Sequence, residues 1–553
     1  MSDTSEPTKF DINALSNDPI AFPTLSKAEI EILRRTGEET ILPDRAAFWN
    51  PGDTDFCFFV ILDGGCIVCD SIESGEMVAY HKPGEFTGDV DMMTGRPAPV
   101  GAYADGETRV LRMSADDVRK LVRLEQDLGG KILLAFIRRR EILLQSTEHG
   151  LLIVGSSYDP ETMRIREFLG RNRVVHRWRQ PEDPETSDIM AAFHLTASDT
   201  PLVFINTEWL SHPSIDYLAQ KLGVQKKTDK RQYDLVIVGA GPAGLAAAVY
   251  GASEGLLTLM LDRSAPGGQA SWSSRIENYM GFPEGLTGSD LAARGLIQAQ
   301  KFGAEISIPA DVVSIEAAKA GHLITLQSGE SIGARAVIVA TGATYQKLDI
   351  PGFAKYETAG VYYSATQLEA GFCKDEEVVV VGAGNSAGQA AVFLSQRCKR
   401  VRLVVRGDRL NKSMSDYLSY RVEQIPNIEV LLSTNVACLH GDERVRSAQL
   451  QGATDELVPC AGLFVFIGAI PNTRFLEGKV AMDRNKFILT GGLIGKEGSA
   501  NTWNEARAPF YLETSFPGIF AAGDCRFGSV KRVASSVGEG SMAVTFVHRI
   551  LAL

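Results

Sequence analysis

The chain has 553 residues, of which 44% are hydrophobic and 22% charged, a composition typical of globular proteins with several domains that excludes the disordered and fibrous classes. Its net charge of −12 at pH 7 excludes a broad basic surface for nucleic acid or anionic lipid. We find no apolar run of about 18 residues and no secretory signal, so we expect a cytoplasmic protein without a membrane span. The eight scattered cysteines fit a reducing compartment, and we expect no metal site.

The first predicted domain covers residues 24–146, which begin as short strands with frequent turns and end in helices. Ser114 and Asp117 indicate a helix start through a capping box, and residues 131–144 have amphipathic helical spacing. A resemblance to cyclic nucleotide-binding domains rests on Phe48–Asp53, Phe59–Gly65 and Pro83–Asp89. It implies a β-roll with a site for a cyclic nucleotide.

The phosphate-binding segment of this domain departs from the family pattern. Where the resemblance implies a Gly-Glu pair, the chain has Gly88 and Asp89, whose side chain is one methylene shorter. The arginine that would pair with the phosphate is expected near Ala98, and the nearest candidate is Arg96. Two interpretations stay open: a structural or dimerising domain, and a sensor that binds a cyclic nucleotide or another anion through Gly88, Asp89 and Arg96.

Two other features of this domain are interpreted as structural. Cys66 and Cys69 are three residues apart on a predicted strand, so their side chains face opposite sides and are expected to be packed residues rather than a redox or metal pair. The basic cluster Arg138–Arg140 is interpreted as a solvated helix face.

Residues 150–223 predict a second, smaller α/β domain. Its expected elements, in chain order, are a strand at Leu151–Gly155, a helix at Glu161–Arg171, strands at Val174–Trp178 and Thr200–Ile205, and a helix at Ser214–Leu222. This order resembles the glutaredoxin or thioredoxin fold, with Thr200-Pro201 at the cis-proline of that family. The turn at Ser156–Glu161 has no cysteine, which favours a docking or oligomerisation module without redox activity, and residues 224–232 are interpreted as a linker.

An internal repeat dominates the remaining sequence. The segment that begins at Asp234 recurs, offset by 143 residues, as the segment that begins at Glu377. Each copy has a β-branched run, a glycine-rich turn and an alanine-rich helical stretch, which is the start of a βαβ nucleotide-binding unit. The sequence therefore predicts two Rossmann-like dinucleotide sites.

The first copy predicts a site for a dinucleotide with a free ribose. Gly239 permits the tight turn, Gly241 allows the backbone to approach a pyrophosphate, and Gly244 allows the helix to pack on the strand. Asp262 follows the next predicted strand, Leu256–Leu261, where a carboxylate accepts hydrogen bonds from ribose hydroxyls.

The second copy has different chemistry at the equivalent position. Its turn contains Gly382, Gly384 and Ala387, and the residue equivalent to Asp262 is Val405, followed by Arg406. Loss of a carboxylate and gain of a guanidinium favour a 2′-phosphate, so we expect NADPH, with NADH less favoured. Arg409 and Lys412 add positive charge. The alternative is that Arg406 is a solvated residue at a strand end.

Further motifs occupy Gly267–Gln269, Ile276–Pro283, Ala340–Gly342, Phe466–Asn472, Gly518–Asp524 and Arg532–Ala534. With these motifs, the chain from about residue 232 to Leu553 resembles the low-molecular-weight thioredoxin reductases, which are flavin-dependent pyridine nucleotide-disulfide oxidoreductases. The resemblance implies an FAD domain from residues 232–350 and 471–553, an NADPH domain at 351–470, and a homodimer. The FAD contacts that it implies, with the first turn included, are Gly239, Gly241, Pro242, Ala243, Gly244, Asp262, Arg263, Gly267, Gly268, Gln269, Asn278, Val312, Ala340, Thr341, Gly342, Gly523, Asp524, Arg532, Val533 and Ala534. The NADPH contacts are Gly382, Gly384, Asn385, Ser386, Ala387, Arg406, Arg409, Lys412, Ile467 and Gly468.

One departure from this family changes the expected chemistry. The positions of its C-x-x-C dithiol hold Ser364 and Gln367, and neither side chain can relay electrons as a thiol does. Cys373 lacks a partner at usable spacing, and Cys525 is a weak redox candidate beside Asp524. We therefore expect an FAD oxidoreductase that takes hydride from NADPH and passes electrons to an acceptor other than thioredoxin, such as a partner protein, a quinone-like molecule or dioxygen.

Two alternatives stay open. The first is a slow-turnover flavoprotein sensor of redox or nucleotide state, regulated through the first domain of the chain. The second is a ferredoxin or flavodoxin reductase on the same scaffold. The second is less favoured, because such relatives carry an aromatic lid on a C-terminal extension, whereas this chain stops after its last predicted helix.

Overall fold

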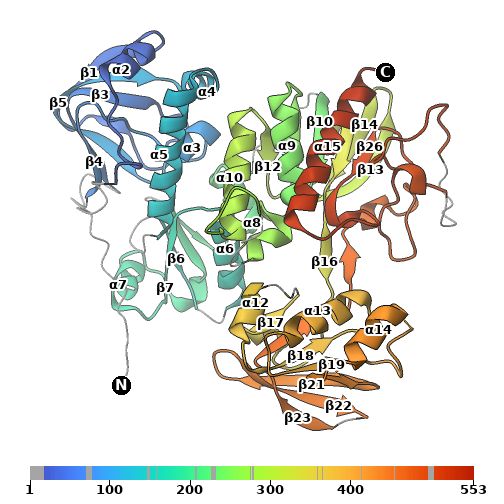
Figure 1. Cartoon of the computed structure of the whole chain (residues 1–553). Coiled ribbons are helices and arrows are strands. Elements are labelled where there is room, and N and C mark those ends of the chain that lie inside the picture. The colour runs from blue at the N-terminus through green and yellow to red at the C-terminus, as the bar shows by residue number, and fades with distance from the viewer. Residues whose placement is uncertain are drawn as a thin grey trace. The chain divides into compact units, whose positions relative to one another are not determined.

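A computed structural model describes residues 18–69, 77–145, 150–156, 159–205, 208–225, 232–273, 276, 279–357, 359–363, 365, 367–412, 414–453, 455–495 and 503–553. Contacts between residues divide the chain into two compact units, one formed by the residues up to Gly342 with Thr473–Leu553 and the other by Ala343–Asn472 (Figure 1). The second unit starts at Ala343 rather than at the expected residue 351, because strand β16 (Ala343–Tyr345) pairs with β25 (Ala469–Pro471). Among the described residues, no helix has the length and apolar character that a bilayer crossing requires.

The first unit begins with an antiparallel β-roll. Its strands pair in the order β1-β5-β3-β4, with β2 on β5, and have the bounds β1 (Glu38–Leu42), β2 (Ala47–Trp49), β3 (Phe58–Cys69), β4 (Met77–His81) and β5 (Gly101–Met113). The helices are α2 (Lys27–Arg34), α3 (Val90–Thr94), α4 (Ala115–Leu124) and α5 (Gln126–Gln145). As predicted, Ser114 caps α4 by accepting a hydrogen bond from Asp117 N. Cys66 and Cys69 are both buried on β3, as expected of packed residues.

The interpretation of Arg138–Arg140 as a solvated helix face is wrong for two of its three residues. Arg139 and Arg140 on α5 are only 8% and 6% exposed, whereas the Arg138 side chain is 41% exposed. Helix α5 packs its apolar stripe against the roll, and position 139 belongs to that stripe because it continues the helical spacing of Ile132 and Phe136.

A four-stranded sheet follows the roll. Its elements are β6 (Leu151–Val154), α6 (Pro160–Arg171), β7 (His176–Arg179), α7 (Pro184–Ala192), β8 (Leu202–Ile205), β9 (Glu208–Ser211) and α8 (Ile215–Lys221). The strand order is β7-β6-β8-β9, with β6 parallel to β7 and antiparallel to β8. The peptide bond between Thr200 and Pro201 is cis and precedes β8, where the resemblance placed it. Helix α7 and strand β9 were not predicted; β9 is mostly exposed, so its sequence lacks an alternating apolar pattern.

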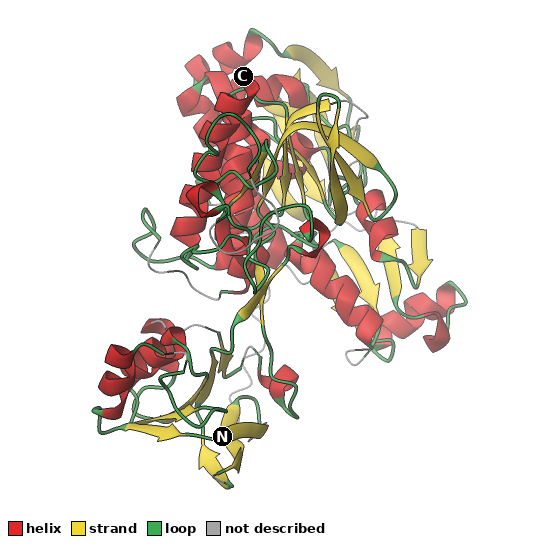
Figure 2. Ribbon diagram, turned by 90° about the vertical axis from the view of Figure 1, so that its right-hand side faces the viewer, coloured by secondary structure: helices red, strands yellow, loops and turns green. Residues whose placement is uncertain are grey.

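The largest sheet carries the first glycine-rich turn. Its order is β12-β11-β10-β15-β14-β13, with β26 beside β15, and the bounds are β10 (Gln232–Val238), β11 (Thr258–Leu261), β12 (Glu305–Ser307), β13 (Val312–Ala318), β14 (Gly321–Leu326), β15 (Ser331–Val339) and β26 (Ile519–Ala521). Helices α9 (Pro242–Ser253), α10 (Gly288–Lys301) and α15 (Val533–Leu551) lie along one face of it (Figure 2). Alternate residues of β10 explain this layering: Leu235 and Ile237 pack toward the helices, and Val236 and Val238 toward the β13–β14 side.

The second unit repeats the strand, turn and helix on a smaller sheet. Its parallel order is β17-β24-β18-β19-β20, with bounds β17 (Val361–Tyr362), β18 (Glu377–Val381), β19 (Arg400–Val404), β20 (Ile428–Leu431) and β24 (Gly462–Val465). A separate antiparallel sheet contains β21 (Thr434–Gly441), β22 (Val445–Gly452) and β23 (Glu456–Pro459), and the helices are α11 (Phe353–Tyr356), α12 (Gln367–Phe372), α13 (Asn385–Ser395) and α14 (Asp416–Glu423). The two repeat copies thus form β10–α9 and β18–α13, as the repeat predicted.

Candidate dinucleotide sites

The first glycine-rich turn forms a cradle at the start of α9. Gly239 has a φ of +109°, and a Cβ atom there would lie 2.3 Å from the Ala340 carbonyl oxygen. A Cβ atom on Gly244 would lie 1.8 Å from the Gly239 carbonyl oxygen, so only glycine allows the helix to approach the turn. Gly241 is the N-cap of α9, and a Cβ atom there would project into open room, 4.0 Å from Gly268 Cα. This room over the unpaired amides of a helix start fits a pyrophosphate.

Asp262 lies beside this turn, as its position after β11 predicted. Its Oδ2 atom accepts a hydrogen bond from Ala240 N at 2.8 Å, and its Oδ1 atom accepts one from Ser264 N at 2.9 Å. Oδ1 also accepts from Ala265 N at 3.2 Å, whereas Oδ2 has Ala240 N as its one donor among the described residues and can still accept from a ribose hydroxyl. Gly267 N donates to Ala240 O at 2.7 Å, which brings the Gly267–Gly268 segment against the turn.

Several of the remaining predicted FAD contacts surround the same edge of the sheet. Ala340 N donates to Val238 O at 2.7 Å, which places Thr341 and Gly342 beside the end of β10. Arg532 is the N-cap of α15, and Val533 and Ala534 are its first residues, whose amides have no intrahelical partner. The rest are distributed as follows: Pro242 and Ala243 start α9, Arg263 follows Asp262, Gln269 lies in a 3₁₀ turn at Gly268–Trp272, Val312 is buried at the start of β13, and Asn278 lies outside the described residues.

Asp524 has an unsatisfied oxygen that fits a cofactor hydroxyl. Its Oδ1 atom is buried and accepts no hydrogen bond from any described residue, and burial raises the pKa of its carboxyl. The segment before it is held by Glu539 on α15, whose Oε2 atom accepts from Gly523 N at 2.7 Å. The glycine cradle and this oxygen together fit the pyrophosphate and a hydroxyl-bearing chain of FAD.

The second glycine-rich turn has the same construction. Gly382 has a φ of +143°, and a Cβ atom there would lie 2.4 Å from the Phe466 carbonyl oxygen. Gly384 is the N-cap of α13, and a Cβ atom there would meet no described atom within 4 Å. Ala387 is buried at the third glycine position, while Asn385 and Ser386 are exposed at the helix start. Asn385 Oδ1 accepts a hydrogen bond from Ser415 N at 2.8 Å.

The residues predicted for a 2′-phosphate lie beyond the end of β19. Val405 is buried, and its side chain has no carboxylate to present where Asp262 does in the first site. Arg406 and Arg409 are exposed, and Lys412 forms an exposed ion pair with Asp408 at 2.7 Å. Ile467 and Gly468 follow β24, and Gly468 O accepts from Gln346 N at 3.0 Å.

The cysteines near the predicted flavin and dithiol positions are buried. Of the dithiol positions, Ser364 lies outside the described residues and Gln367 starts α12. Burial raises the pKa values of Cys373 and Cys525 to about 12, so both thiols are protonated near neutral pH. Cys525 Sγ lies 3.4 Å from the carbonyl oxygens of Val339 and Ala522. These contacts favour a packed residue over a redox thiol.

We expect Cys525 to be inert in the folded protein. Alkylation requires the thiolate form of the cysteine, and a pKa of about 12 makes the thiolate fraction negligible at pH 8. Treatment with iodoacetamide followed by peptide mass spectrometry should leave Cys525 unmodified until the protein is unfolded, and Cys525→Ala should keep flavin reduction within about twofold of wild type. Cys438, half-buried with its Sγ 3.0 Å from His440 Nε2, is the positive control. Rapid alkylation of native Cys525 would contradict this assignment.

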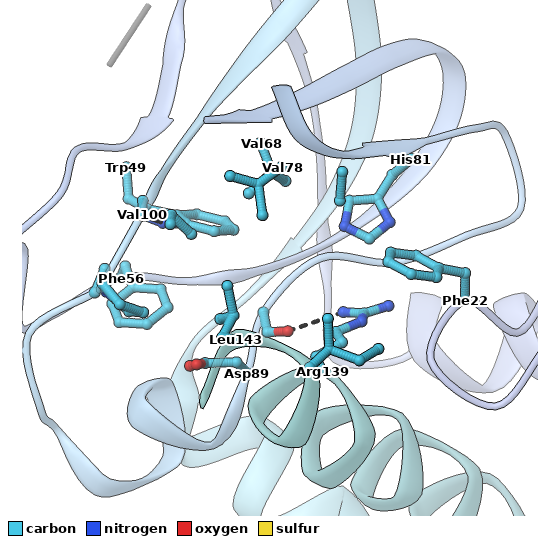
Figure 3. Close-up of a pocket in the computed structure, with 15 residues that line it drawn as sticks. Phe22, Trp49, Phe56, Val68, Val78, His81, Asp89, Val100, Arg139 and Leu143 are labelled. Carbon is cyan, nitrogen blue, oxygen red and sulfur yellow. Dashed lines mark hydrogen bonds between the residues drawn. The ribbon is translucent and has the colours of Figure 1, made fainter. Parts of the chain in front are cut away.

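The β-roll contains a cavity of about 70 Å³, and two of the three predicted effector-phosphate residues line it (Figure 3). Gly88 and Asp89 lie in its wall, but Arg96 does not. Arg96 Nη1 instead donates to Asn172 O at 3.0 Å, and Asn172 Nδ2 donates to Ser264 O at 3.1 Å, two residues after Asp262. These hydrogen bonds connect the roll to the first dinucleotide site.

Arg139 is the lining residue that sequence reasoning missed. Its guanidinium donates to the carbonyl oxygens of Ala21, Gly88 and Phe86 at 2.8, 2.8 and 2.9 Å. Burial lowers its pKa to about 10, which leaves it charged at neutral pH. Its burial could have been inferred from its position on the apolar stripe of α5, where a charged side chain is buried and needs hydrogen-bond partners.

Comparison with known proteins shows two family matches. Residues 233–540 match the family described as pyridine nucleotide-disulphide oxidoreductase, and residues 40–125 match the cyclic nucleotide-binding domain. Thioredoxin reductase of Listeria innocua is 33% identical over 320 residues, and the match covers 57% of this chain and 93% of the relative. Thioredoxin reductase of Chlamydia trachomatis is 35% identical over 328 residues, and that match covers 57% of this chain and 98% of the relative. The solved thioredoxin reductase of Giardia duodenalis is 27% identical with a TM-score of 0.51, and the match covers 58% of this chain and all of that one.

Proposed function

Because this chain belongs to the pyridine nucleotide-disulphide oxidoreductase family and is a thioredoxin reductase-type enzyme that uses FAD and NAD(P)H, we propose that it oxidises NADPH and reduces an acceptor other than thioredoxin. The single observation that supports this proposal is that the chain has two glycine-rich turns shaped for dinucleotides but has Ser364 and Gln367, not cysteines, at the dithiol positions. The overall reaction transfers two electrons and one proton from NADPH, with a second proton from solvent, to the acceptor.

FAD, when bound, accepts hydride from the nicotinamide and passes the electrons on. The residues proposed to hold it are the Gly239–Gly244 turn, through amides at the start of α9, and Asp262 at the ribose. Asp524 would accept a hydrogen bond from the flavin side chain, and the first amides of α15 would donate to the ring. Their contribution is orientation and charge stabilisation of a bound group.

We expect Arg406→Ala to weaken the binding of NADPH much more than the binding of NADH. A guanidinium that pairs with a 2′-phosphate contributes about 1.5–3 kcal/mol, so the NADPH concentration that half-saturates flavin reduction should rise about tenfold to a hundredfold, and that of NADH less than twofold. Arg400→Ala is the matched control, because Arg400 is an exposed arginine at the opposite end of β19. Equal effects on both nucleotides would contradict the 2′-phosphate site.

Anaerobic stopped-flow mixing with NADPH, followed at the flavin absorbance near 450 nm, tests the proposal. We expect fast bleaching, and no reoxidation when the reduced protein is mixed with thioredoxin and a disulfide reporter. Quinones, dioxygen and candidate partner proteins are then tested as oxidants of the same reduced sample. Fast reoxidation by thioredoxin would overturn the proposed acceptor class, and absence of bleaching would overturn the enzyme proposal.

A second candidate function is a slow-turnover sensor. The observation that favours it is the hydrogen-bonded connection from Arg96 through Asn172 to Ser264, which links the β-roll to the loop of Asp262. Under this proposal an effector of the roll, whether a cyclic nucleotide or another molecule, changes flavin reduction by NADPH. Robust turnover with an acceptor, unchanged by any roll ligand, would exclude it. A homodimer and a thioredoxin-like docking role for residues 150–223 are proposed by family analogy.

A further inference from the structure

The cavity in the β-roll has a mostly apolar wall. Trp49, Phe56, Val68, Val100 and Leu143 line it, and the one polar group of Trp49 is already satisfied because Nε1 donates to Val100 O at 2.8 Å. A volume of about 70 Å³ is several times the room that one water molecule needs, about 10–15 Å³. This room suits a single ring better than a purine, a ribose and a phosphate together.

Buried carboxylates outnumber buried guanidinium groups around the cavity. Arg139 and Arg140 face the carboxylates of Asp89, Asp91 and Glu85, and all five residues are at most 9% exposed. Arg140 pairs with Asp91, and its Nη2 lies 3.7 Å from Asp89 Oδ2. Arg139 is further held by three carbonyl oxygens and by the rings of Phe22 and Phe86, at 5.3 and 4.8 Å from their centroids. An added anion would increase this excess of buried negative charge and would be destabilised.

Two polar atoms in the wall have a charged neighbour but no hydrogen bond, because Asp89 Oδ2 lies 3.7 Å from Arg140 Nη2 and His81 Nδ1 lies 3.7 Å from Glu85 Oε2. Asp89 Oδ2 and His81 Nδ1 are buried and form no hydrogen bond with any described residue, and their side chains lie among those that line the cavity (Figure 3). Asp89 Oδ1 is used in capping α3, where it accepts from Asp91 N at 2.8 Å. Because a buried acceptor without a hydrogen bond is costly, Asp89 Oδ2 favours a ligand that donates a hydrogen bond.

We propose that this cavity binds a small uncharged aromatic molecule with one O–H or N–H group, of the phenol or indole class, rather than a cyclic nucleotide. The ring packs against Trp49, Phe56 and Val100, and its donor pairs with Asp89 Oδ2. The residue that sequence analysis assigned to the phosphate, Arg96, is engaged with Asn172 O outside the cavity wall. This proposal does not depend on the identity of the electron acceptor.

Isothermal titration of the full chain at pH 7 tests this with four probes: phenol, toluene, benzoate and cyclic AMP. We expect saturable one-to-one binding of phenol, binding of toluene at least about tenfold weaker because it lacks the donor, and no binding of benzoate or cyclic AMP. Binding of cyclic AMP or benzoate in competition with phenol, or failure of phenol to bind at millimolar concentration, would overturn the proposal.

Three variants test where phenol binds. Val100→Trp should fill the cavity and abolish phenol binding, while Ile41→Trp, at a 59% exposed position on β1 of the same roll, should leave it unchanged. Asp89→Asn keeps the size of the side chain and its ability to cap α3. This variant should weaken the binding of phenol about tenfold and leave the binding of toluene unchanged. Flavin content and circular dichroism report folding of each variant. Equal phenol affinity of the wild type and Asp89→Asn would contradict the proposed hydrogen bond between phenol and Asp89.

Discussion

Gly244→Ala is expected to give protein without bound FAD. A Cβ atom at this position would lie 1.8 Å from the Gly239 carbonyl oxygen, which is backbone and cannot rotate away. Helix α9 would have to move off the turn, and the amides at its start would lose their position for a pyrophosphate. The ratio of absorbance near 450 nm to that at 280 nm in the purified protein measures the loss.

Gly295→Ala on α10 is the control for this effect. Its Cβ atom would meet Leu245 at 3.6 Å, an ordinary contact, in the same helical layer. Because alanine is the better helix residue, this variant should remain yellow and gain up to about 1 kcal/mol of stability. A Gly244→Ala protein as yellow as wild type would show that the turn does not hold the cofactor.

Glu539→Ala is expected to reduce the free energy of unfolding by about 3–5 kcal/mol, because it leaves the buried Arg526 guanidinium without its carboxylate. The side chains of Arg526 and Glu539 are 6% and 13% exposed, and Arg526 Nε lies 3.2 Å from Glu539 Oε2. The same oxygen accepts from Gly523 N, so the loop that presents Asp524 also loses its attachment. Urea denaturation followed by circular dichroism, with FAD content measured in parallel, tests both effects.

An exposed ion pair provides the comparison. The Lys486 and Glu477 side chains are 54% and 44% exposed with N and O atoms 3.4 Å apart, so Glu477→Ala should change stability by less than about 1 kcal/mol. The double variant Arg526→Met with Glu539→Leu should recover part of the loss, since it removes the unpaired charge. Similar denaturation midpoints for Glu539→Ala and Glu477→Ala would contradict the role given to the buried pair.

The features that sequence reasoning located correctly depend on local backbone constraints. Gly239 and Gly382 have positive φ values in tight turns between a strand and a helix, and a repeat of such turns is visible without knowledge of distant contacts. Asp262 was placed by its distance from the turn, and the structure shows it accepting from Ala240 N.

The features that were missed depend on partners far away in the sequence. Arg139 is buried because carbonyl oxygens 51 to 118 residues away accept from its guanidinium, and no local pattern specifies them. Asn172 joins Arg96 to Ser264 over separations of 76 and 92 residues. The boundary between the two compact units at Gly342, eight residues before the expected boundary at residue 350, likewise depends on pairing of β16 with β25, more than 100 residues on.

The helices on the large sheet share their apolar core with the four-stranded domain, so the two cannot be separated into independent fragments. Phe168 and Leu218 of the four-stranded domain belong to one continuous apolar core with Leu245 of α9 and Ile306 of β12. The small domain is therefore not a detachable appendage, because a shorter chain starting at β10 would expose that shared surface to water. Heat should melt the small domain and the sheet with the first glycine-rich turn together, in a single cooperative transition.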